Sequence, residues 1–254
     1  MIVRPSLIEE LKKPLQIIRE VPDWKEMLKT QMRVSKKRLH TYTINGFKIT
    51  ARCNDSTDPT AIREIFLYQT YTRYLPLEKK DVVLDLGAHI GCFSILAGSR
   101  SKKVFAFEPN DESYTLLRLN IKNNDLENVE SFKKAVTNEE TKYIKFFVHR
   151  RWNGCNSTLP VKGHEKVVKV QNQNLEEFLE KNKISFIKMD VEGGEYHLLP
   201  VMVKHQIPKI VFEIHKVKGY KKSSLINLLK ENGYKVIIEK QWLPRPEIIH
   251  AWRE

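Results

Sequence analysis

The 254-residue sequence has few cysteines and no long apolar segment, and we find no internal repeat. Its 3 cysteines, Cys53, Cys92 and Cys155, are odd in number and include no Cys-x-x-Cys pair. This argues against a disulfide scaffold and against a structural zinc site. The N-terminus lacks a continuous signal-peptide-like apolar stretch, and nowhere do about 18 apolar residues follow one another. We therefore expect a soluble, cytoplasmic protein without a membrane span.

Positive charge is in excess, with 44 Lys and Arg residues against 31 Asp and Glu and a formal net charge of +13. Summed positive charge attracts polyanions whatever the fold, so nucleic acid is one candidate partner. The basic residues are spread along the chain, however, and the densest run is only Lys36-Lys37-Arg38. A solvated surface that keeps the protein soluble is the alternative interpretation.

The first 55 residues predict two helices and a hairpin. Ser6-x-x-Glu9 forms a capping box that opens a helix, which Pro14 should kink or split. A second helix start follows at residues 23–26. Two strand-like runs then flank Asn45-Gly46, the residue pair that favours a two-residue hairpin turn. We expect residues 1–55 to form an appendage to a main domain over residues 56–254.

In the main domain, Asp58-Pro59 predicts a helix start with Asp58 as the N-cap. Apolar runs typical of buried parallel strands then alternate with helical patterns. The strands are expected at 82–86, 104–107, 184–191 and 209–214, and the helices at 91–98, 111–123, 194–204 and 223–232. Two last strands, at 234–239 and 247–252, should pair antiparallel because their loop is too short for a crossover helix.

These patterns predict an α/β fold, a Rossmann-like, doubly wound and mostly parallel sheet that ends in an antiparallel hairpin. Residues 141–172 depart from the alternation, because two strand-like runs there flank the polar loop 150–157. We interpret them as an insertion over the active face.

Two motifs indicate a site for a nucleotide-containing cofactor. Asp85-Leu-Gly87-Ala88-His-Ile-Gly91 ends the first parallel strand and enters a helix, where glycine lets a ligand approach free backbone N–H groups. Glu108 ends the next strand, and a carboxylate at that place accepts hydrogen bonds from a ribose diol. Glu108 would repel the 2′-phosphate of NADP, whereas NAD remains an alternative. A tight turn and a solvated carboxylate are the purely structural interpretations.

Carboxylates cluster at the ends of the two following strands. Lys188-Met-Asp190-Val-Glu192-Gly-Gly-Glu195 ends one strand at the edge where open α/β sheets bind ligands, and Lys188 could pair with Asp190. Glu213 and His215 share one side of the next strand and can serve as an acid/base pair. Asp190, Glu192, Glu213 and His215 could also bind a metal, although we predict a metal-free site. Solvation at the strand ends is the structural alternative.

Together the motifs resemble the FkbM-type methyltransferases, which are class I S-adenosylmethionine-dependent enzymes. The likeness rests on residues 84–94, Phe107-Glu-Pro-Asn110, residues 187–195 and Val211-Phe-Glu-Ile-His215. It implies that S-adenosylmethionine is the cofactor and assigns the following roles to residues of this sequence. The methionine part of the cofactor would be held by Asp85, Gly87, Ala88 and Gly91, and its ribose hydroxyls would be bound by Glu108. The adenine would be bordered by Pro109, Asn110 and Ala135. Asp190 would lie near the sulfonium methyl.

We predict O-methylation of a hydroxylated acceptor, a sugar or another small molecule. Asp190 would orient or deprotonate the acceptor, helped by Glu192 or His215. The sequence lacks the Asn/Asp-Pro-Pro-Tyr/Phe motif of amino-methyltransferases and a Pro-Cys nucleophile after a strand. One alternative is RNA methylation through the basic N-terminal segment and the 141–172 loop, with residues 150–152 gripping phosphates and stacking a base. Another is a non-catalytic module that binds the cofactor, against which the carboxylate cluster argues.

Overall fold

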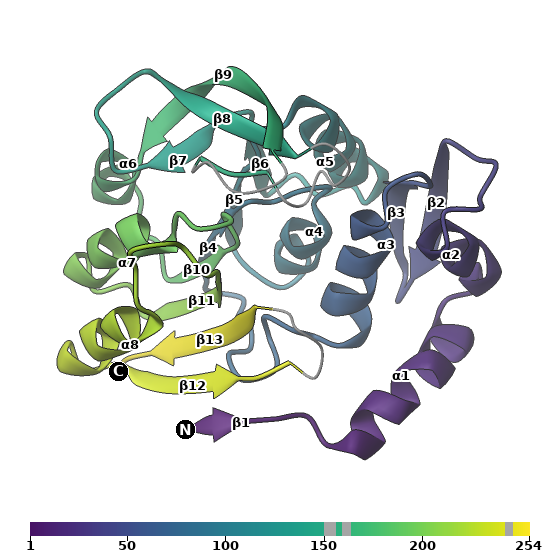
Figure 1. Cartoon of the computed structure of the whole chain (residues 1–254), viewed down its shortest axis with the longest axis horizontal. Helices are drawn as coiled ribbons and strands as arrows, with labels where there is room; N and C mark the ends of the chain where they lie inside the picture. Colours follow the sequence, from purple (N-terminus) through teal and green to yellow (C-terminus); the bar gives the residue numbers. More distant parts are fainter. Residues whose placement is uncertain (150–155, 159–163, 242–245) are drawn as a thin grey trace.

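The computed structural model describes residues 1–149, 156–158, 164–241 and 246–254 (Figure 1). Its centre is an eight-stranded sheet in the order β1-β12-β13-β11-β10-β4-β5-β6. The parallel strands of its main part are β4 (Val82–Leu86), β5 (Lys103–Phe107), β6 (Val129–Phe132), β10 (Phe186–Met189) and β11 (Lys209–Ile214). The hairpin strands β12 (Lys235–Glu239) and β13 (Glu247–Trp252) pair antiparallel, with β13 inserted beside β11. The predicted fold class is confirmed.

Helices cover both faces of this sheet because its strands bury apolar side chains alternately on either side. On one face lie α6 (Leu175–Lys181), α7 (Glu195–Lys204) and α8 (Lys222–Glu231), packed with Leu84 and Ile187 of the sheet. On the other lie α4 (Cys92–Gly98) and α5 (Asp111–Asn123), packed with Val83 and Phe186. The carboxyl ends of β4, β5, β10 and β11 all open at the same edge, where the predicted motifs lie.

The N-terminal residues wrap along the main domain (Figure 1). Strand β1 (Ile2–Val3) pairs with β12 and is followed by α1 (Leu7–Glu20) and α2 (Trp24–Gln31). The helix α1 is continuous across Pro14, so the expected split is wrong. Pro14 removes only one backbone N–H donor from the helix, and the Ser6 capping box stabilises the start of the helix. Strands β2 (Leu39–Ile44) and β3 (Phe47–Arg52) form the predicted hairpin, with Asn45 and Gly46 both at positive φ.

This segment is tied to the main domain by side-chain contacts. The Asn120 amide of α5 accepts from the Thr50 N–H at 2.7 Å and donates to the Thr50 carbonyl at 2.9 Å. Asn124 makes the same pair of bonds to Lys48. The proposed boundary between residues 55 and 56 stays a prediction, and the segment before it packs against α5.

The helix predicted at Asp58 begins two residues earlier. α3 (Thr57–Ile62) has Ser56 at its N-cap and continues into the π-helical turn η1 (Arg63–Leu67). Asp58 lies inside the first turn and is buried against Arg52, so its expected capping role is wrong. An ion pair with Arg52, at the end of the preceding strand β3, decides its position.

The predicted insertion forms a small three-stranded sheet of β7 (Ala135–Thr137), β9 (His164–Asn174) and β8 (Tyr143–His149). This sheet lies above β5 and β6 in Figure 1. Residues 150–155, which include Cys155 and most of the predicted polar loop, lie outside the described residues. Among the residues that are described, no helix combines the length and apolarity needed to cross a membrane.

Candidate active site

A cavity of about 370 Å³ opens at the carboxyl ends of the parallel strands. This is the edge at which open α/β sheets bind ligands. Seven of the predicted site residues line it: Gly87, Ala88, Glu108, Pro109, Ala135, Asp190 and Glu192. Four others, Asp85, Gly91, Asn110 and His215, are not among the described lining residues. The structure therefore brings most of the predicted residues to one cavity and places the rest around it.

The loop after β4 is shaped by glycines that no other residue could replace without strain. Gly87 has a φ of +74°, and a Cβ added there would lie 1.8 Å from the Asp190 carbonyl oxygen. The N–H groups of Gly87 and Ala88 both donate to the Phe107 carbonyl, at 3.1 and 3.0 Å. Gly91, at +90°, begins α4 against Leu117. These contacts hold the ends of β4, β5 and β10 close together.

A buried ion pair lies beneath this loop. Lys188 Nζ is 3.2 Å from Asp85 Oδ1 and donates to the Gly87 carbonyl at 2.7 Å, while Ser94 donates to Asp85 Oδ2 at 2.6 Å. Burial lowers the pKa of Lys188, but the carboxylates of Asp85 and Asp190 outweigh it and raise the pKa overall. Lys188 thus pairs with Asp85 rather than with Asp190, and Asp85 supports the loop from below.

The carboxylate of Glu108 is held by two backbone donors. Its Oε2 accepts from the His89 N–H and its Oε1 from the Asn110 N–H, both at 2.8 Å. Burial raises its pKa, although these bonds and the nearby His89 oppose the effect. Each carboxylate oxygen accepts more than one hydrogen bond. Glu108 therefore keeps acceptor capacity at the cavity surface.

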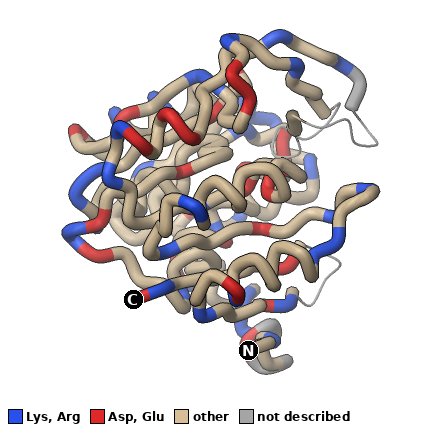
Figure 2. Tube along the Cα trace, turned by 90° about the vertical axis from the view of Figure 1, so that its left-hand side faces the viewer, with Lys and Arg blue, Asp and Glu red and all other residues tan. Residues whose placement is uncertain are grey.

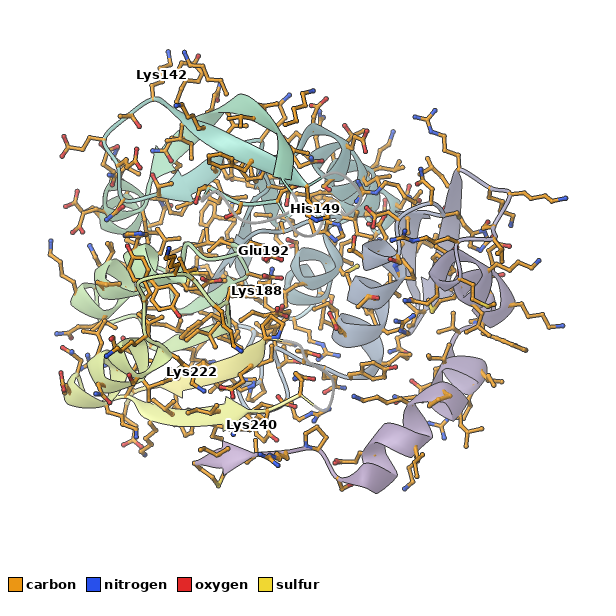
Figure 3. The ribbon with its side chains drawn as sticks, viewed as in Figure 1. Lys142, His149, Lys188, Glu192, Lys222 and Lys240 are labelled. Atoms are coloured by element: carbon orange, nitrogen blue, oxygen red, sulfur yellow. The ribbon has the colours of Figure 1, made fainter. Side chains whose placement is uncertain are left out.

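A second group of ionisable side chains lies at the ends of β10 and β11. The hydroxyl of Tyr71, which is only 4% exposed, donates to Glu213 Oε1 at 2.8 Å, and Asp190 Oδ2 lies 3.4 Å from the same Oη. One ligand atom each from Asp190, Glu213 and His215 lies within 4.8 Å of the others, a spacing that could hold a metal ion. Figure 3 shows Lys188 and Glu192 together at this central edge, far from the peripheral Lys142.

His215 is surrounded by carboxylates. Its Nδ1 lies 2.7 Å from Glu195 Oε1 and its Nε2 lies 3.3 Å from Glu192 Oε2. Burial lowers the pKa of His215, but the bond to Glu195 and the Glu192 charge raise it more strongly, to about 10. For Glu192, burial and the Asp190 charge raise the pKa to about 7, although His215 opposes the shift. His215 is therefore a cation at neutral pH, and its positive charge offsets the negative charge of the neighbouring carboxylates.

The model of the Methyltransferase FkbM domain matches residues 85–236, more than half of the chain. The chain belongs to the FkbM methyltransferase family. It is an S-adenosylmethionine-dependent methyltransferase, as its motifs predicted. A comparison with curated proteins gives no match.

Solved structures similar to this FkbM-family chain include two whose matches cover most of its length. TYW2 from M. jannaschii, in complex with AdoMet, is 16% identical over 86% of each chain, with a TM-score of 0.50. A transferase from Pyrococcus horikoshii is 14% identical over 86% of this chain and 72% of its own, with a TM-score of 0.52. At these identities the likeness shows the fold alone.

The cavity of this FkbM-family chain fits the cofactor. It joins the buried Glu108 carboxylate, which suits a ribose diol, to the apolar surfaces of Phe107, Pro109 and Ala135, which suit a flat adenine ring. Asn110 borders this side but points its amide oxygen at the start of α5, where it accepts from the Ser113 N–H. The individual roles assigned to these residues stay predictions.

Sequence reasoning missed two residues of this site. Tyr71 follows η1 and meets Asp190 and Glu213 only through the fold, across more than a hundred residues of chain. His89 lies inside a quoted motif, but its positive φ of 53° and its backbone bond to Glu108 were not foreseen. The only available signal was its position between Gly87 and Gly91.

Proposed function

We propose that this methyltransferase methylates a hydroxyl oxygen of a sugar or another small hydroxylated acceptor, with Asp190 orienting and deprotonating that hydroxyl. The observation that carries the proposal is the place of Asp190. The backbone of Asp190 contacts the Gly87 loop, and its side chain lies within hydrogen-bond distance of the Tyr71 hydroxyl. Gly87, Tyr71 and Asp190 all line one cavity. Asp190 therefore lies between the predicted cofactor side and a second polar side that an acceptor could enter.

S-adenosylmethionine, when bound, supplies a methyl group that its sulfonium has already activated. The chain's own residues have to orient the acceptor, exclude water and take up a proton. Tyr71 is suited to fixing this arrangement, because burial and the charges of Glu213 and Asp190 raise its pKa and keep it a hydrogen-bond donor. Its bonds hold both carboxyl groups in place.

The electrostatics of the cluster distinguish Glu213 from an ordinary carboxyl group. Burial, together with the charges of Asp190 and Glu64, raises the pKa of Glu213 well above its ordinary value. Glu213 therefore gives up its proton less readily than an ordinary carboxyl group, because a second negative charge beside Asp190 is unfavourable. Because His215 is protonated, it is a poor base, and we assign it the role of balancing Glu192 rather than the predicted help in catalysis.

The rest of the cavity supports a small polar acceptor. Beyond Tyr71 the lining includes Thr60, Glu64, Tyr68 and Arg73, which offer hydroxyl, carboxylate and guanidinium groups beside an aromatic ring. Such groups hydrogen-bond to the hydroxyls of a sugar, and an aromatic ring packs against its C–H face. Residues 60–73, which lie in α3, in η1 and in the turn after it, thus provide much of the proposed acceptor side.

A radiolabelled methyl-transfer screen over glycans, small hydroxylated molecules and RNA tests the proposal. With an acceptor found, Asp190→Asn should lower kcat about 100-fold or more, since general acid–base catalysis contributes at least that factor. The Kd of S-adenosylmethionine, measured by calorimetry, should stay within about threefold. Asp125→Asn, at the end of α5 and outside the described cavity lining, is the matched control.

Unchanged turnover in Asp190→Asn would contradict the base assignment. Turnover that is lost in EDTA and restored by a divalent cation would instead favour a metal held by Asp190, Glu213 and His215. Turnover that persists in EDTA supports a carboxylate acting alone.

RNA is the second candidate acceptor, on account of one surface feature. Tyr143 on β8 is 41% exposed, and the ammonium groups of Lys142 and Lys169 lie 5.7 and 4.5 Å from its ring centre. Exposed aromatic rings among lysines bind single-stranded bases and phosphates. Figure 2, however, shows Lys and Arg spread over many elements rather than along one stripe. Filter binding tests whether RNA is the acceptor. If RNA binds through its phosphates, the logarithm of the binding constant falls linearly with the logarithm of the salt concentration.

A further inference from the structure

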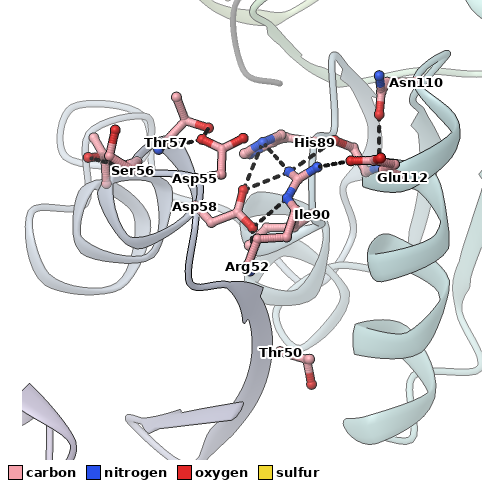
Figure 4. A network of polar contacts seen from close by, with 12 residues as sticks. Thr50, Arg52, Asp55, Ser56, Thr57, Asp58, His89, Ile90, Asn110 and Glu112 are labelled. Atoms are coloured by element: carbon pink, nitrogen blue, oxygen red, sulfur yellow. Dashed lines mark hydrogen bonds and ion pairs between the residues drawn. The ribbon is translucent and has the colours of Figure 1, made fainter. Parts of the chain in front are cut away.

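Six residues around the Glu108 carboxylate form a closed circuit of hydrogen bonds. They come from the end of β3, the first turn of α3, the loops that follow β4 and β5, and the first turn of α5. In chain order they are Arg52, Asp58, His89, Glu108, Asn110 and Ser113. Figure 4 shows the part of this circuit around Arg52. The Arg52 side chain therefore connects the N-terminal segment to the proposed ribose site.

The buried ion pair of Arg52 and Asp58 holds the guanidinium group of the circuit in place. Asp58 Oδ2 accepts from the backbone N–H of Arg52 at 2.7 Å and from its Nε at 2.9 Å, and Oδ1 accepts from Nη2 at 2.7 Å. Burial works against the charged form, but His89 and Arg52 lower the pKa of Asp58 to about 2. A buried, bidentate pair of this kind has one geometry.

His89 joins this pair to the cofactor loop. Its Nε2 lies 3.1 Å from Arg52 Nη2 and 3.2 Å from Asp58 Oδ1. The backbone of the same residue has a φ of +53°, and its N–H donates to Glu108 Oε2. Because the positive φ is unfavourable for a residue with a Cβ, the side-chain anchor helps to hold the N–H in its position.

The other half of the circuit returns to Arg52 through α5. The Asn110 N–H donates to Glu108 Oε1, and the Asn110 side chain caps α5 by accepting from the Ser113 N–H at 3.0 Å. Ser113 Oγ in turn accepts from Arg52 Nη2 at 3.2 Å. Both donors that orient Glu108 are thus linked to the same guanidinium group.

We propose that Arg52, Asp58 and His89 are positioning residues for the ribose of S-adenosylmethionine and act through Glu108. This inference rests on the proposed ribose role of Glu108. A carboxylate that is already oriented by two fixed donors loses little freedom when it accepts from a diol. Releasing His89 frees one of these donors, so the ribose hydroxyls bind less strongly while the rest of the cofactor is unaffected.

The test compares S-adenosylhomocysteine with its 2′-deoxy analogue by calorimetry. The wild-type protein should bind the ribose form about tenfold more tightly, which is the effect of one hydrogen bond to a charged group. His89→Gly removes the imidazole that contacts Arg52 and Asp58, and glycine adopts the positive φ without strain. This variant should reduce the preference for the ribose form to about threefold or less. Gln206→Gly is the matched control: Gln206 is exposed, has a φ of +54° and is not among the described cavity-lining residues, and its replacement should leave the preference intact.

Two further variants separate the inference from its premise. Arg52→Lys keeps the charge but loses the bidentate contact, and it should lower the preference without lowering affinity for the 2′-deoxy analogue. Glu108→Gln should reduce the preference by itself, and adding His89→Gly to it should cause no further loss. A merely structural role for His89 would instead weaken both ligands equally.

Equal weakening of both ligands in His89→Gly, or an unchanged preference, overturns the positioning role. If Glu108→Gln removes the preference and His89→Gly does not, the ribose role of Glu108 stands and only the positioning inference fails. If Glu108→Gln leaves the preference intact, the ribose role and the inference that rests on it both fail.

Discussion

The most direct perturbation of the cofactor loop is Gly87→Ala. The added methyl group would lie 1.8 Å from the Asp190 carbonyl oxygen, and real Cβ contacts are hardly ever shorter than 3.0 Å. The ends of β4 and β10 must therefore separate by about 1.2 Å at this point. The obstacle is backbone on both sides, so no side-chain rotation relieves it.

Two costs add in this variant. Alanine at a φ of +74° costs about 1 kcal/mol relative to glycine, and overpacking against a fixed neighbour costs about 1–3 kcal/mol more. Gly233→Ala isolates the first cost, because Gly233 has a φ of +81° and nothing lies within 4 Å of its added Cβ. We expect a loss of about 3 kcal/mol for Gly87→Ala and about 1 kcal/mol for Gly233→Ala.

Urea unfolding measures these free energies, and calorimetry with S-adenosylmethionine measures the site. Because a displacement of about 1 Å can cost about 100-fold in rate, the folded Gly87→Ala protein should also lose turnover and cofactor affinity, whereas Gly233→Ala should keep both. Equal destabilisation of the two variants, with binding unchanged in both, would refute the steric argument.

Three further predictions concern the ionisable groups. Tyr71→Phe should lower kcat about tenfold and leave the cofactor Kd unchanged, because the described partners of its hydroxyl are Asp190 and Glu213; an equal loss of cofactor affinity would contradict this. Lys188→Met should cost about 3–5 kcal/mol in urea unfolding, since it leaves a buried carboxylate without its cation, and a loss below about 1 kcal/mol would argue against the ion pair. His215→Gln should change the pH dependence of stability: the folded-state pKa of about 10 exceeds the ordinary 6.5, so the wild-type advantage, on the order of 5 kcal/mol, is complete below pH 6.5 and disappears as the pH rises to about 10. Parallel unfolding curves for variant and wild type across that range would contradict the last prediction.

Local patterns in the sequence were enough to predict much of the sheet and one end of the cavity. Hydrophobic runs and turn residues predicted four of the five main parallel strands and the final antiparallel hairpin, because strand periodicity and loop length depend on adjacent residues. The short edge strands β6 and β1 were not predicted. The glycine motif and Glu108 predicted one end of the cavity, since the carboxyl ends of parallel strands meet at one edge. The family resemblance supplied the cofactor, which the motifs alone left open.

Side-chain pairs between different helices and strands could not be predicted in this way. Asp58 was expected to cap a helix, but Arg52 draws it into a buried ion pair. Lys188 was expected beside Asp190, but it lies 3.2 Å from Asp85 on the neighbouring strand. In both cases the observed ion-pair partner lies on another helix or strand, and only the packing of the two elements brings the charged groups together.

The sequence by itself thus determined the order of elements, the parallel sheet and the chemical types gathered at its edge, because each depends on local spacing. Only the tertiary structure decided which charges pair, that Tyr71 meets Asp190 and Glu213, and that His215 is held as a cation. The physical reason is that burial and electrostatic interaction act through space. A side chain's charge state and partner depend on neighbours that the fold brings within a few ångströms, whatever their distance along the chain.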